Sequence, residues 1–391
     1  MKGRIFIIFM LLIGAAAMYS CGNKSAVESE DKANLLALYN CTVINGSDGE
    51  PVNNGVILMR GDMIEKIGES SSLSIPEDFK KIDLNGKTVL PGFINAHVHL
   101  AYNETNLKNW LMGGVTTVRD MDPGPSIDFT SFRDENNKRS DTSRIVSSSP
   151  MLTVKNGYGS VYFSSTEEAV GLVNSYIDKN ADLVKISLEE YLRGIKWSMP
   201  KSDQSKAIVE AAHARGVLVS VHITDEKFLK QAVELGVDDL AHMVVNNTDD
   251  ETIEAIINKD IYWEPTLELW HGVGGNYIKT AISNLSRFYK AGGKIALGTD
   301  FAGYTCKFDT GFPITEVKLM SEAGMSNMDI IKAGTINAAH VCGMEEEFGS
   351  LEVGKIADIL VVEGNPLDNI EDLQNTYMVI HNGQVVFTKV D

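Results

Sequence analysis

The residues Pro91-Gly92-Phe93-Ile94-Asn95-Ala96-His97-Val98-His99 decide the fold, because an apolar strand ends there in two histidines two positions apart. Side chains two apart on a strand share one face of it. Both imidazoles can therefore point into one cavity and bind one ion, since neutral imidazole is a preferred ligand of zinc and neighbouring metals. Ordinary strands also end in pairs of polar residues, so the metal prediction depends on the rest of the chain.

Four more candidate ligands follow the same pattern, because each of them ends a short apolar run. They are Lys185 after residues 182–184, His222 after residues 217–221, His242 after residues 240–241, and Asp300 after residues 295–299. Taken singly, each has an ordinary explanation: a surface lysine, a core histidine or the N-cap of a helix. A chance scatter of polar residues would not place all of them at the ends of strands.

Segments with a helical spacing of apolar residues separate these runs, for example residues 204–215, 226–235 and 252–258. Strands that alternate with helices predict a parallel sheet. Counting from Phe93, the chain contains eight candidate strands, which include residues 115–119, 145–152 and 261–267. We therefore predict an α/β fold, a (β/α)8 TIM barrel over residues 91–349, with its chemistry at the carboxyl ends of the strands.

A smaller domain is predicted from both ends of the chain. Residues 36–90 consist of short strand-like runs broken by Asn-Gly and similar turns, and residues 350–391 have the same character. We expect the two segments to form one composite β-sandwich domain.

The first 20 residues have the form of a secretory signal peptide, because Met1-Lys2-Gly3-Arg4 is basic and residues 5–18 are apolar but too short to span a bilayer. Residues 19–22, Tyr-Ser-Cys-Gly, then resemble a bacterial lipoprotein cleavage site at which Cys21 becomes lipidated. Ordinary secretion with a chance cysteine is the alternative. Residues 21–35 have the composition of a polar tether. We expect export from a bacterial cytoplasm to the periplasm, the outer membrane or the cell surface, with a lipid anchor as the membrane contact.

The chain is acidic, with a formal net charge of −18 that becomes −20 if Lys2 and Arg4 leave with the signal peptide. Such a surface argues against nucleic acid and anionic lipid as charge partners. The expected partner is a small-molecule substrate, and assembly into a homo-oligomer stays open.

The chain resembles members of the amidohydrolase superfamily of metal-dependent hydrolases, and in particular the binuclear branch with prolidase-like and imidazolonepropionase-related proteins. The matching motifs are residues 91–99, Gly113-Gly114-Val115-Thr116-Thr117-Val118-Arg119-Asp120, the strand that contains Lys185, His222, His242, the Gly-Thr-Asp that ends at Asp300, Asn337-Ala338-Ala339, and residues 349–362. They occur in the order of the family between Leu38 and Val386.

The resemblance implies two divalent metal ions, with zinc as the expected metal, and N6-carboxylation of Lys185. In the binuclear members a carboxylated lysine bridges the ions, and the expected ligands are His97, His99 and Asp300 for one ion and His222 and His242 for the other. Two ions about 3.5–4 Å apart share one water, lower its pKa and polarise the substrate carbonyl. Asp300 is then expected to be the catalytic general base and, later, the general acid.

The predicted activity is hydrolysis of an amide-type C–N bond by a metal-bridging hydroxide, in a dipeptide, an N-acyl amino acid or a cyclic amide. A lactonase or esterase would use the same hydroxide. A mononuclear deaminase is a further alternative, although such deaminases typically have a glutamate three residues after the strand-five histidine, where this chain has Asp225. A non-catalytic surface binding protein is the last alternative, and the complete set of ligands argues against it.

Four residues are predicted to contact the substrate: Arg119, Tyr158, Tyr191 and His271. Arg119 can bind a carboxylate through two hydrogen bonds or pair with the adjacent Asp120. The two tyrosines belong to aromatic-rich loops, which either stack on an apolar substrate or shield the site from solvent. His271 is the one further histidine expected on the catalytic side.

Overall fold

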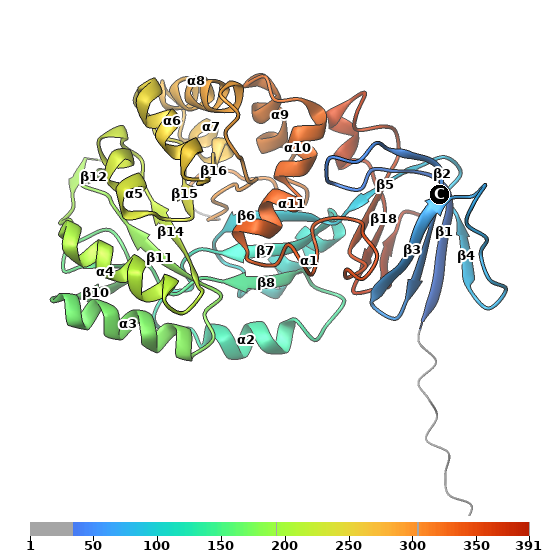
Figure 1. Cartoon of the computed structure of the whole chain (residues 1–391), viewed down its shortest axis with the longest axis horizontal. Helices are drawn as coiled ribbons and strands as arrows, with labels where there is room; N and C mark the ends of the chain where they lie inside the picture. The colour runs from blue at the N-terminus through green and yellow to red at the C-terminus, as the bar shows by residue number, and fades with distance from the viewer. Residues whose placement is uncertain (1–33, 193, 303–304, 391) are drawn as a thin grey trace, which may run out of the picture. The chain divides into compact units, whose positions relative to one another are not determined.

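The computed structural model describes residues 34–192, 194–302 and 305–390 (Figure 1). The predicted signal peptide over residues 1–20 and the predicted lipidation site Cys21 lie outside these residues. The predicted tether 21–35 also lies outside them except for its last two positions, and the first strand already begins at Leu35. No helix among the described residues is long and apolar enough to cross a membrane.

A mixed eight-stranded sheet joins strands from both ends of the described chain. Its order is β19-β18-β17-β5-β1-β2-β3, with β4 beside β1. The strands are β1 (Leu35–Val43), β2 (Val52–Arg60), β3 (Met63–Glu69), β4 (Lys80–Asp83), β5 (Thr88–Pro91), β17 (Ile359–Val362), β18 (Thr376–His381) and β19 (Gln384–Thr388). β17 runs antiparallel to β5, with Ile359 opposite Pro91, so the C-terminal strands extend the N-terminal ones directly.

Both faces of this sheet bury apolar side chains. In β1, Leu36 and Leu38 belong to one apolar cluster and Ala37 belongs to another, because successive side chains on a strand point to opposite faces. Ile359 and Ile380 from the C-terminal strands lie in the same cluster as Leu36. The two chain ends therefore share one core, while the sandwich arrangement and the domain boundaries stay predictions.

Two parallel sheets carry the candidate ligands. Their orders are β6-β7-β8 and β10-β9-β11-β14-β15-β16. The strands are β6 (Phe93–Val98), β7 (Val115–Asp120), β8 (Arg144–Ser147), β9 (Leu152–Val154), β10 (Val161–Phe163), β11 (Leu183–Ser187), β14 (Leu218–His222), β15 (Asp239–Ala241) and β16 (Tyr262–Glu264). All pairings within these two sheets are parallel, so the predicted α/β class with parallel strands is confirmed.

The eighth predicted strand of the barrel is not a regular strand. Isolated parallel bridges join Ile295 to Trp263 and Phe301 to Val98, so residues 295–301 lie between β16 and β6. A further isolated bridge connects the segment after β8 to the start of β11. Asp300 has a φ of 59°, a left-handed conformation that interrupts a strand. Within the described residues, two parallel sheets linked by bridges are therefore seen, and not one continuous closed sheet.

Helices alternate with the parallel strands, and Figure 1 shows α3 and α4 side by side next to β11. The helices are α1 (Glu104–Met112), α2 (Phe129–Asn136), α3 (Thr166–Asp178), α4 (Ser202–His213), η1 (Glu226–Phe228), α5 (Leu229–Leu235), α6 (Asp250–Asn258), α7 (Leu267–Val273), α8 (Tyr277–Lys290), α9 (Ile314–Glu322), α10 (Asn327–Ala333), α11 (Ile336–Val341) and η2 (Ile370–Gln374). Polar side chains begin several of them: Asp249 accepts a hydrogen bond from the Thr252 amide at 2.7 Å and starts α6. The three predicted helical segments correspond to α4, to η1 with α5, and to α6.

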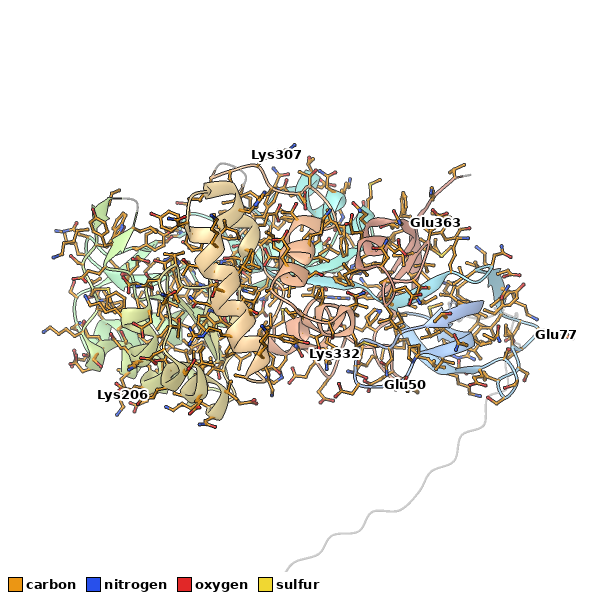
Figure 2. All side chains as sticks on the ribbon, turned by 90° about the horizontal axis from the view of Figure 1, so that it is seen from above. Glu50, Glu77, Lys206, Lys307, Lys332 and Glu363 are labelled. Atoms are coloured by element: carbon orange, nitrogen blue, oxygen red, sulfur yellow. The ribbon has the colours of Figure 1, made fainter. Side chains whose placement is uncertain are left out.

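Two further short strands, β12 (Tyr191–Leu192) and β13 (Ile195–Lys196), pair antiparallel as a hairpin between β11 and α4. Charged side chains such as Glu50, Glu77 and Lys206 are exposed and point outward (Figure 2). The surface of the described chain is therefore charged, as the composition indicates.

Candidate metal centre

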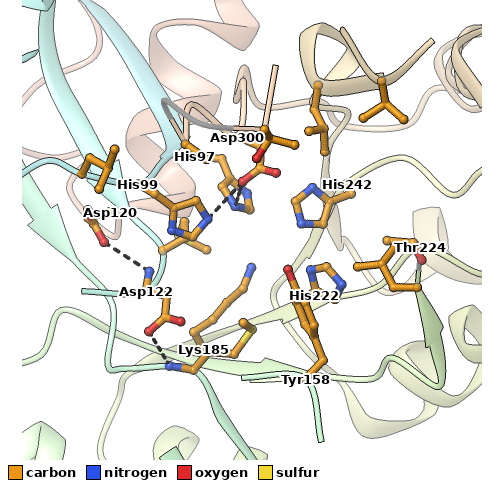
Figure 3. A pocket seen from close by; sticks show the side chains of 18 of the residues that line it. His97, His99, Asp120, Asp122, Tyr158, Lys185, His222, Thr224, His242 and Asp300 are labelled. Atoms are coloured by element: carbon orange, nitrogen blue, oxygen red, sulfur yellow. Dashed lines mark hydrogen bonds and ion pairs between the residues drawn. The ribbon is translucent and has the colours of Figure 1, made fainter. Parts of the chain in front are cut away.

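One cavity of about 800 Å³ is lined by all six predicted metal-ligating residues (Figure 3). They are His97, His99, Lys185, His222, His242 and Asp300. His97, Lys185 and His222 lie in β6, β11 and β14. His99 and His242 directly follow β6 and β15, and Asp300 ends the irregular run that begins at residue 295. Because neighbouring parallel strands end at the same edge of a sheet, residues far apart in the sequence meet there.

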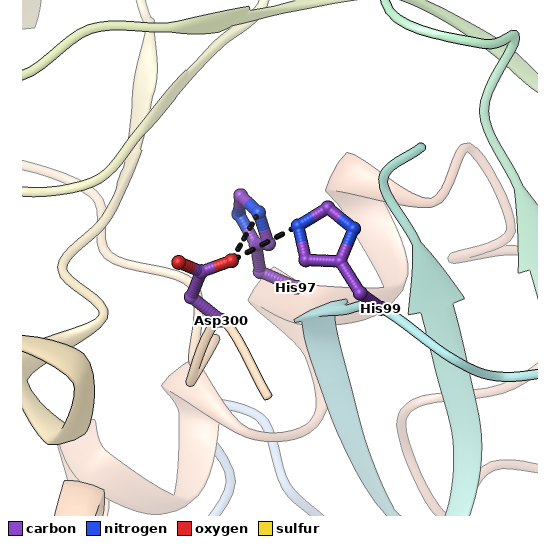
Figure 4. A group of neighbouring side chains, drawn as sticks. All are labelled: His97, His99 and Asp300. Atoms are coloured by element: carbon purple, nitrogen blue, oxygen red, sulfur yellow. Dashed lines mark ion pairs between the residues drawn. The ribbon is translucent and has the colours of Figure 1, made fainter. Parts of the chain in front are cut away.

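His97, His99 and Asp300 form a compact group (Figure 4). The Oδ1 atom of Asp300 lies 3.4 Å from Nε2 of His97 and 3.0 Å from Nε2 of His99. The ligand atoms of the three residues lie within 4.8 Å of one another. This spacing suits a single metal ion.

His222 and His242 form a second group on the other side of the cavity from His99, and Figure 3 shows the Lys185 side chain reaching between the two groups. The ring centroids of His222 and His242 are 4.7 Å apart, and those of His242 and His97 are 4.8 Å apart. The imidazoles therefore form one continuous cluster.

Three of the imidazoles contact a further polar side chain through one ring nitrogen. The contacts are His97 Nδ1 to Glu264 Oε2 at 3.1 Å, His242 Nδ1 to Thr266 Oγ1 at 3.0 Å, and His222 Nε2 to Glu189 Oε2 at 3.3 Å. The other nitrogen of each ring remains for a metal ion. Such outer partners fix the orientation of a ligating ring in metal sites.

These outer partners were missed by the sequence reasoning. Glu264 had a signal, because it is a charged residue inside the apolar run 261–267. Glu189 had none, although it is buried and its carboxylate also accepts hydrogen bonds from Thr224 Oγ1 at 2.6 Å and from the Tyr191 amide at 3.0 Å.

Burial lowers the pKa of three histidines, His97, His222 and His242. The charge of Lys185 lowers the pKa of His97 further. These rings are therefore uncharged at neutral pH, which is the form that binds a metal ion. His99 differs, because burial opposes its charged form but the hydrogen bond and charge of Asp300 prevail and raise its pKa.

Lys185 is almost completely buried, and its Nζ atom lies 3.5 Å from Ser220 Oγ. Burial lowers the pKa of the Lys185 amine to about 7, although the charge of Asp239 opposes this. A large fraction of the amine is therefore uncharged at neutral pH.

Two carboxylates in the cavity have opposite pKa shifts. Burial opposes ionisation of Asp300, but the electrostatic interaction with His242 and the hydrogen bond from His99 outweigh it and lower the pKa of Asp300. Burial raises the pKa of Asp120 to about 6, against the effect of hydrogen bonds from the amides of Ala101 and Asp122. Asp120 lines the cavity and was not predicted to be part of the site.

Both predicted tyrosines line the cavity. The Tyr158 ring lies 4.5 Å from the His222 ring, measured between centroids. Tyr191 lies in the β12–β13 hairpin and is 64 % exposed. Their positions agree with the predicted substrate contacts, which stay predictions.

The predicted substrate contact of Arg119 is wrong. Arg119 does not line the cavity and has no exposed surface. Its guanidinium donates hydrogen bonds to the carbonyl oxygens of Ala96 and Val341 at 2.6 Å each and forms ion pairs with Asp239 and Glu264. Successive side chains on β7 point to opposite faces, so Asp120, the residue after Arg119, faces the cavity instead.

The predicted substrate contact of His271 is also wrong. Its side chain is exposed and does not line the cavity. On α7 the cavity is lined by Leu269, Trp270 and Val273, which share one side of the helix. His271 falls on the other side because of the helical repeat.

A family model described as the amidohydrolase family matches residues 88–386. The chain is 24 % identical over 426 aligned positions to ochratoxinase from Aspergillus niger, with 91 % of this chain and 86 % of that protein covered. It is 23 % identical over 442 positions to imidazolonepropionase from Clostridium tetani, with 97 % and 98 % covered. The crystal structure of a Xaa-Pro dipeptidase with bound methionine in its active site aligns with a TM-score of 0.79 at 23 % identity, covering 91 % of this chain and all of that one.

The chain therefore belongs to the amidohydrolase family, as its motifs indicated, and it is an enzyme that hydrolyses carbon–nitrogen bonds. The family generally uses divalent metals, and the group of His97, His99 and Asp300 offers a place for one.

Proposed function

We propose that this protein is a binuclear metal-dependent hydrolase that cleaves an amide-type C–N bond in a small-molecule substrate. A dipeptide, an N-acyl amino acid and a cyclic amide are the substrate classes in view. The observation that carries the proposal is the convergence of four imidazoles, one buried lysine and one carboxylate in a single cavity at the ends of parallel strands.

The donor set fits two divalent cations, and zinc is the metal expected for imidazole ligands. His97, His99 and Asp300 would hold one cation, and His222 and His242 would hold the other. The lowered pKa values of three of these rings support the assignment, because they keep the rings uncharged at neutral pH. The outer contacts of the same rings support it as well.

Lys185 suits a position between two cations only after modification, because an ammonium group repels them. The uncharged amine has a lone pair that can form a bond to the carbon of carbon dioxide. One proton leaves the nitrogen, and the product is an N6-carboxylate with one negative charge and two oxygen ligands. The pKa of about 7 makes the amine available for this reaction near neutral pH.

When bound, the two cations would polarise the substrate carbonyl and lower the pKa of the attacking water. Asp300 is proposed to take the proton of that water and to deliver it to the leaving nitrogen. Its lowered pKa keeps the carboxylate ionised and able to accept the proton. Tyr158 and Tyr191 are proposed to contact the substrate from the cavity wall.

We further propose a closed barrel and a β-sandwich domain for this protein. The two parallel sheets and residues 295–301 would form one (β/α)8 barrel, with the bridges between them as its remaining joints. The mixed sheet would form the composite β-sandwich domain. We also propose that the protein is an exported lipoprotein anchored through Cys21, and that it can form a homo-oligomer.

The structure gives the deaminase alternative no support at Asp225, the position where such deaminases typically have a glutamate. Asp225 accepts hydrogen bonds from the Lys227 amide and from Asn246 Nδ2, both at 2.9 Å, and it does not line the cavity. An ester or a lactone would use the same groups as an amide. A binding protein without turnover would not need the full set of candidate ligands.

The test is hydrolysis of a panel of dipeptides, N-acyl amino acids, cyclic amides and lactones by protein prepared with zinc and bicarbonate. We expect amide hydrolysis that is lost on chelation and restored by zinc. Asp300→Asn should lower kcat by about 10²–10⁴-fold, the usual contribution of general acid–base catalysis. Asp225→Asn should retain activity and serves as the control. Lactone turnover without amide turnover, or deamination instead of either, would refute the proposal.

A further inference from the structure

Exposed apolar side chains gather at the mouth of the candidate metal cavity. Tyr191 is 64 % exposed and Ile195 is 52 % exposed, and both line the cavity. Six large apolar residues are both exposed and part of the cavity lining, and we refer to them as the apolar rim: Leu100, Ile127, Tyr191, Ile195, Val273 and Tyr277. They come from the segments after β6 and β7, from the β12–β13 hairpin and from α7 and α8.

Two rows of rings connect the candidate ligands to this mouth. On one side the His242 ring lies 6.5 Å from Trp270, and Trp270 lies 6.0 Å from Tyr277 of the rim, measured between centroids. On the other side the His222 ring lies 4.5 Å from Tyr158, and Tyr158 lies 5.5 Å from Trp197. Trp197 follows β13, which carries Ile195 of the rim. Apolar and aromatic side chains therefore line the cavity from the candidate ligands to its mouth.

The apolar rim lies at the mouth of the cavity, and this position indicates what kind of ligand covers it. Exposed apolar side chains that gather in one place mark a site where a ligand or partner binds, whereas single exposed ones are ordinary. A ligand that enters a cavity of about 800 Å³ and leaves a large substituent at the mouth would cover both surfaces at once. A small polar dipeptide would reach the candidate ligands and leave the rim in water.

We propose that the cavity and the apolar rim bind a large apolar substituent of the amide substrate, either a long acyl chain or an aryl group. The proposal rests on the proposed function and narrows its substrate class to amides that carry such a substituent. The substituent would lie between the two rows of rings and extend to the β12–β13 hairpin.

The test is calorimetric titration of the full-length, zinc-loaded protein with amide analogues in which a methylene replaces the amide nitrogen, so that no C–N bond can be hydrolysed. The acyl groups carry alkyl chains of two, six and ten carbons in total. A naphthoyl analogue tests whether the cavity prefers an aryl group to an alkyl chain. Burial of one methylene corresponds to about a fourfold gain in affinity. We expect Kd to fall by about two- to fourfold for each added carbon, because the rim stays partly open to water.

Two rim variants and one control variant locate the binding surface. Tyr191→Ser and Ile195→Ser should reduce the ratio of the affinities for the ten-carbon and two-carbon analogues by about tenfold. Tyr162→Ser is the matched control, because Tyr162 is a strand tyrosine that is 51 % exposed and does not line the cavity. It should leave the ratio unchanged.

Affinity that does not depend on chain length or on the aryl group would overturn the inference. So would rim variants that keep the affinity ratio and instead change the oligomeric state or the binding to lipid vesicles, because the rim would then be an interface. Failure of the proposed function looks different: the analogues would bind as expected, but no amide would be hydrolysed. Hydrolysis of short acyl amides with no preference for long or aryl groups would overturn this inference alone.

Discussion

Replacing Arg119 by methionine should destabilise the protein by about 3–5 kcal/mol, the usual cost of removing one partner from a buried ion pair. Arg119 has no exposed surface, and neither do its two carboxylate partners, Asp239 and Glu264. Methionine has a similar length and no charge, so the variant leaves two buried carboxylates without their cation. The carbonyl oxygens of Ala96 and Val341 also lose their donor.

Urea unfolding followed by circular dichroism measures the effect of Arg119→Met. With a slope of about 3 kcal/mol per M, the midpoint should fall by roughly 1–2 M. Arg215→Met is the control, because Arg215 pairs with Asp178 on the surface and such pairs contribute about 0–1 kcal/mol. If Arg119→Met instead kept the stability within about 1 kcal/mol of wild type and raised KM, the structural role of Arg119 would be refuted and a substrate contact favoured.

Two further predictions concern other buried carboxylates. Burial raises the pKa of Glu268 to about 9, so between the unfolded value of about 4.3 and pH 9 the folded protein holds a proton that the unfolded chain has lost. The stability contributed by this group is therefore full below about pH 4.3 and falls as the pH rises toward 9, by up to about 1.4 kcal/mol per pH unit. Glu268→Gln should remove this decline, and equal pH slopes in urea unfolding of both proteins would contradict the reasoning. Glu189→Gln should weaken divalent metal binding by about 10–100-fold in competition with a chelator, because it frees the His222 ring. The neighbouring Glu190→Gln is the control, and the same loss in both variants would point to a general effect of charge.

Much of the candidate site could be predicted from the sequence because two simple rules place it. The period of two on a strand puts His97 and His99 on one side, and parallel strands end at one edge of a sheet. Together they bring Lys185 and His222 into the same cavity.

Other parts of the site could not be predicted because they depend on contacts between distant segments. Nothing in the local pattern tells which of the adjacent Arg119 and Asp120 faces the cavity, since that depends on how β7 sits against its neighbours. The pairing of Glu189 with His222 depends on the loop after β11. The run that ends at Asp300 has the composition of a strand, but its pairing with the neighbouring segments is reduced to isolated bridges at Ile295 and Phe301.

The proposed binuclear centre is tested most directly by elemental analysis of the metal content per chain. The protein lacking residues 1–21 would be purified with added zinc and bicarbonate, beside the variant Lys185→Ala. We predict two ions per chain in the wild type and one or none in the variant, because Lys185 is proposed to supply the bridging carboxylate. One ion per chain in both proteins would contradict the bridged centre and favour the mononuclear alternative, and no ion in either would contradict metal-dependent hydrolysis altogether.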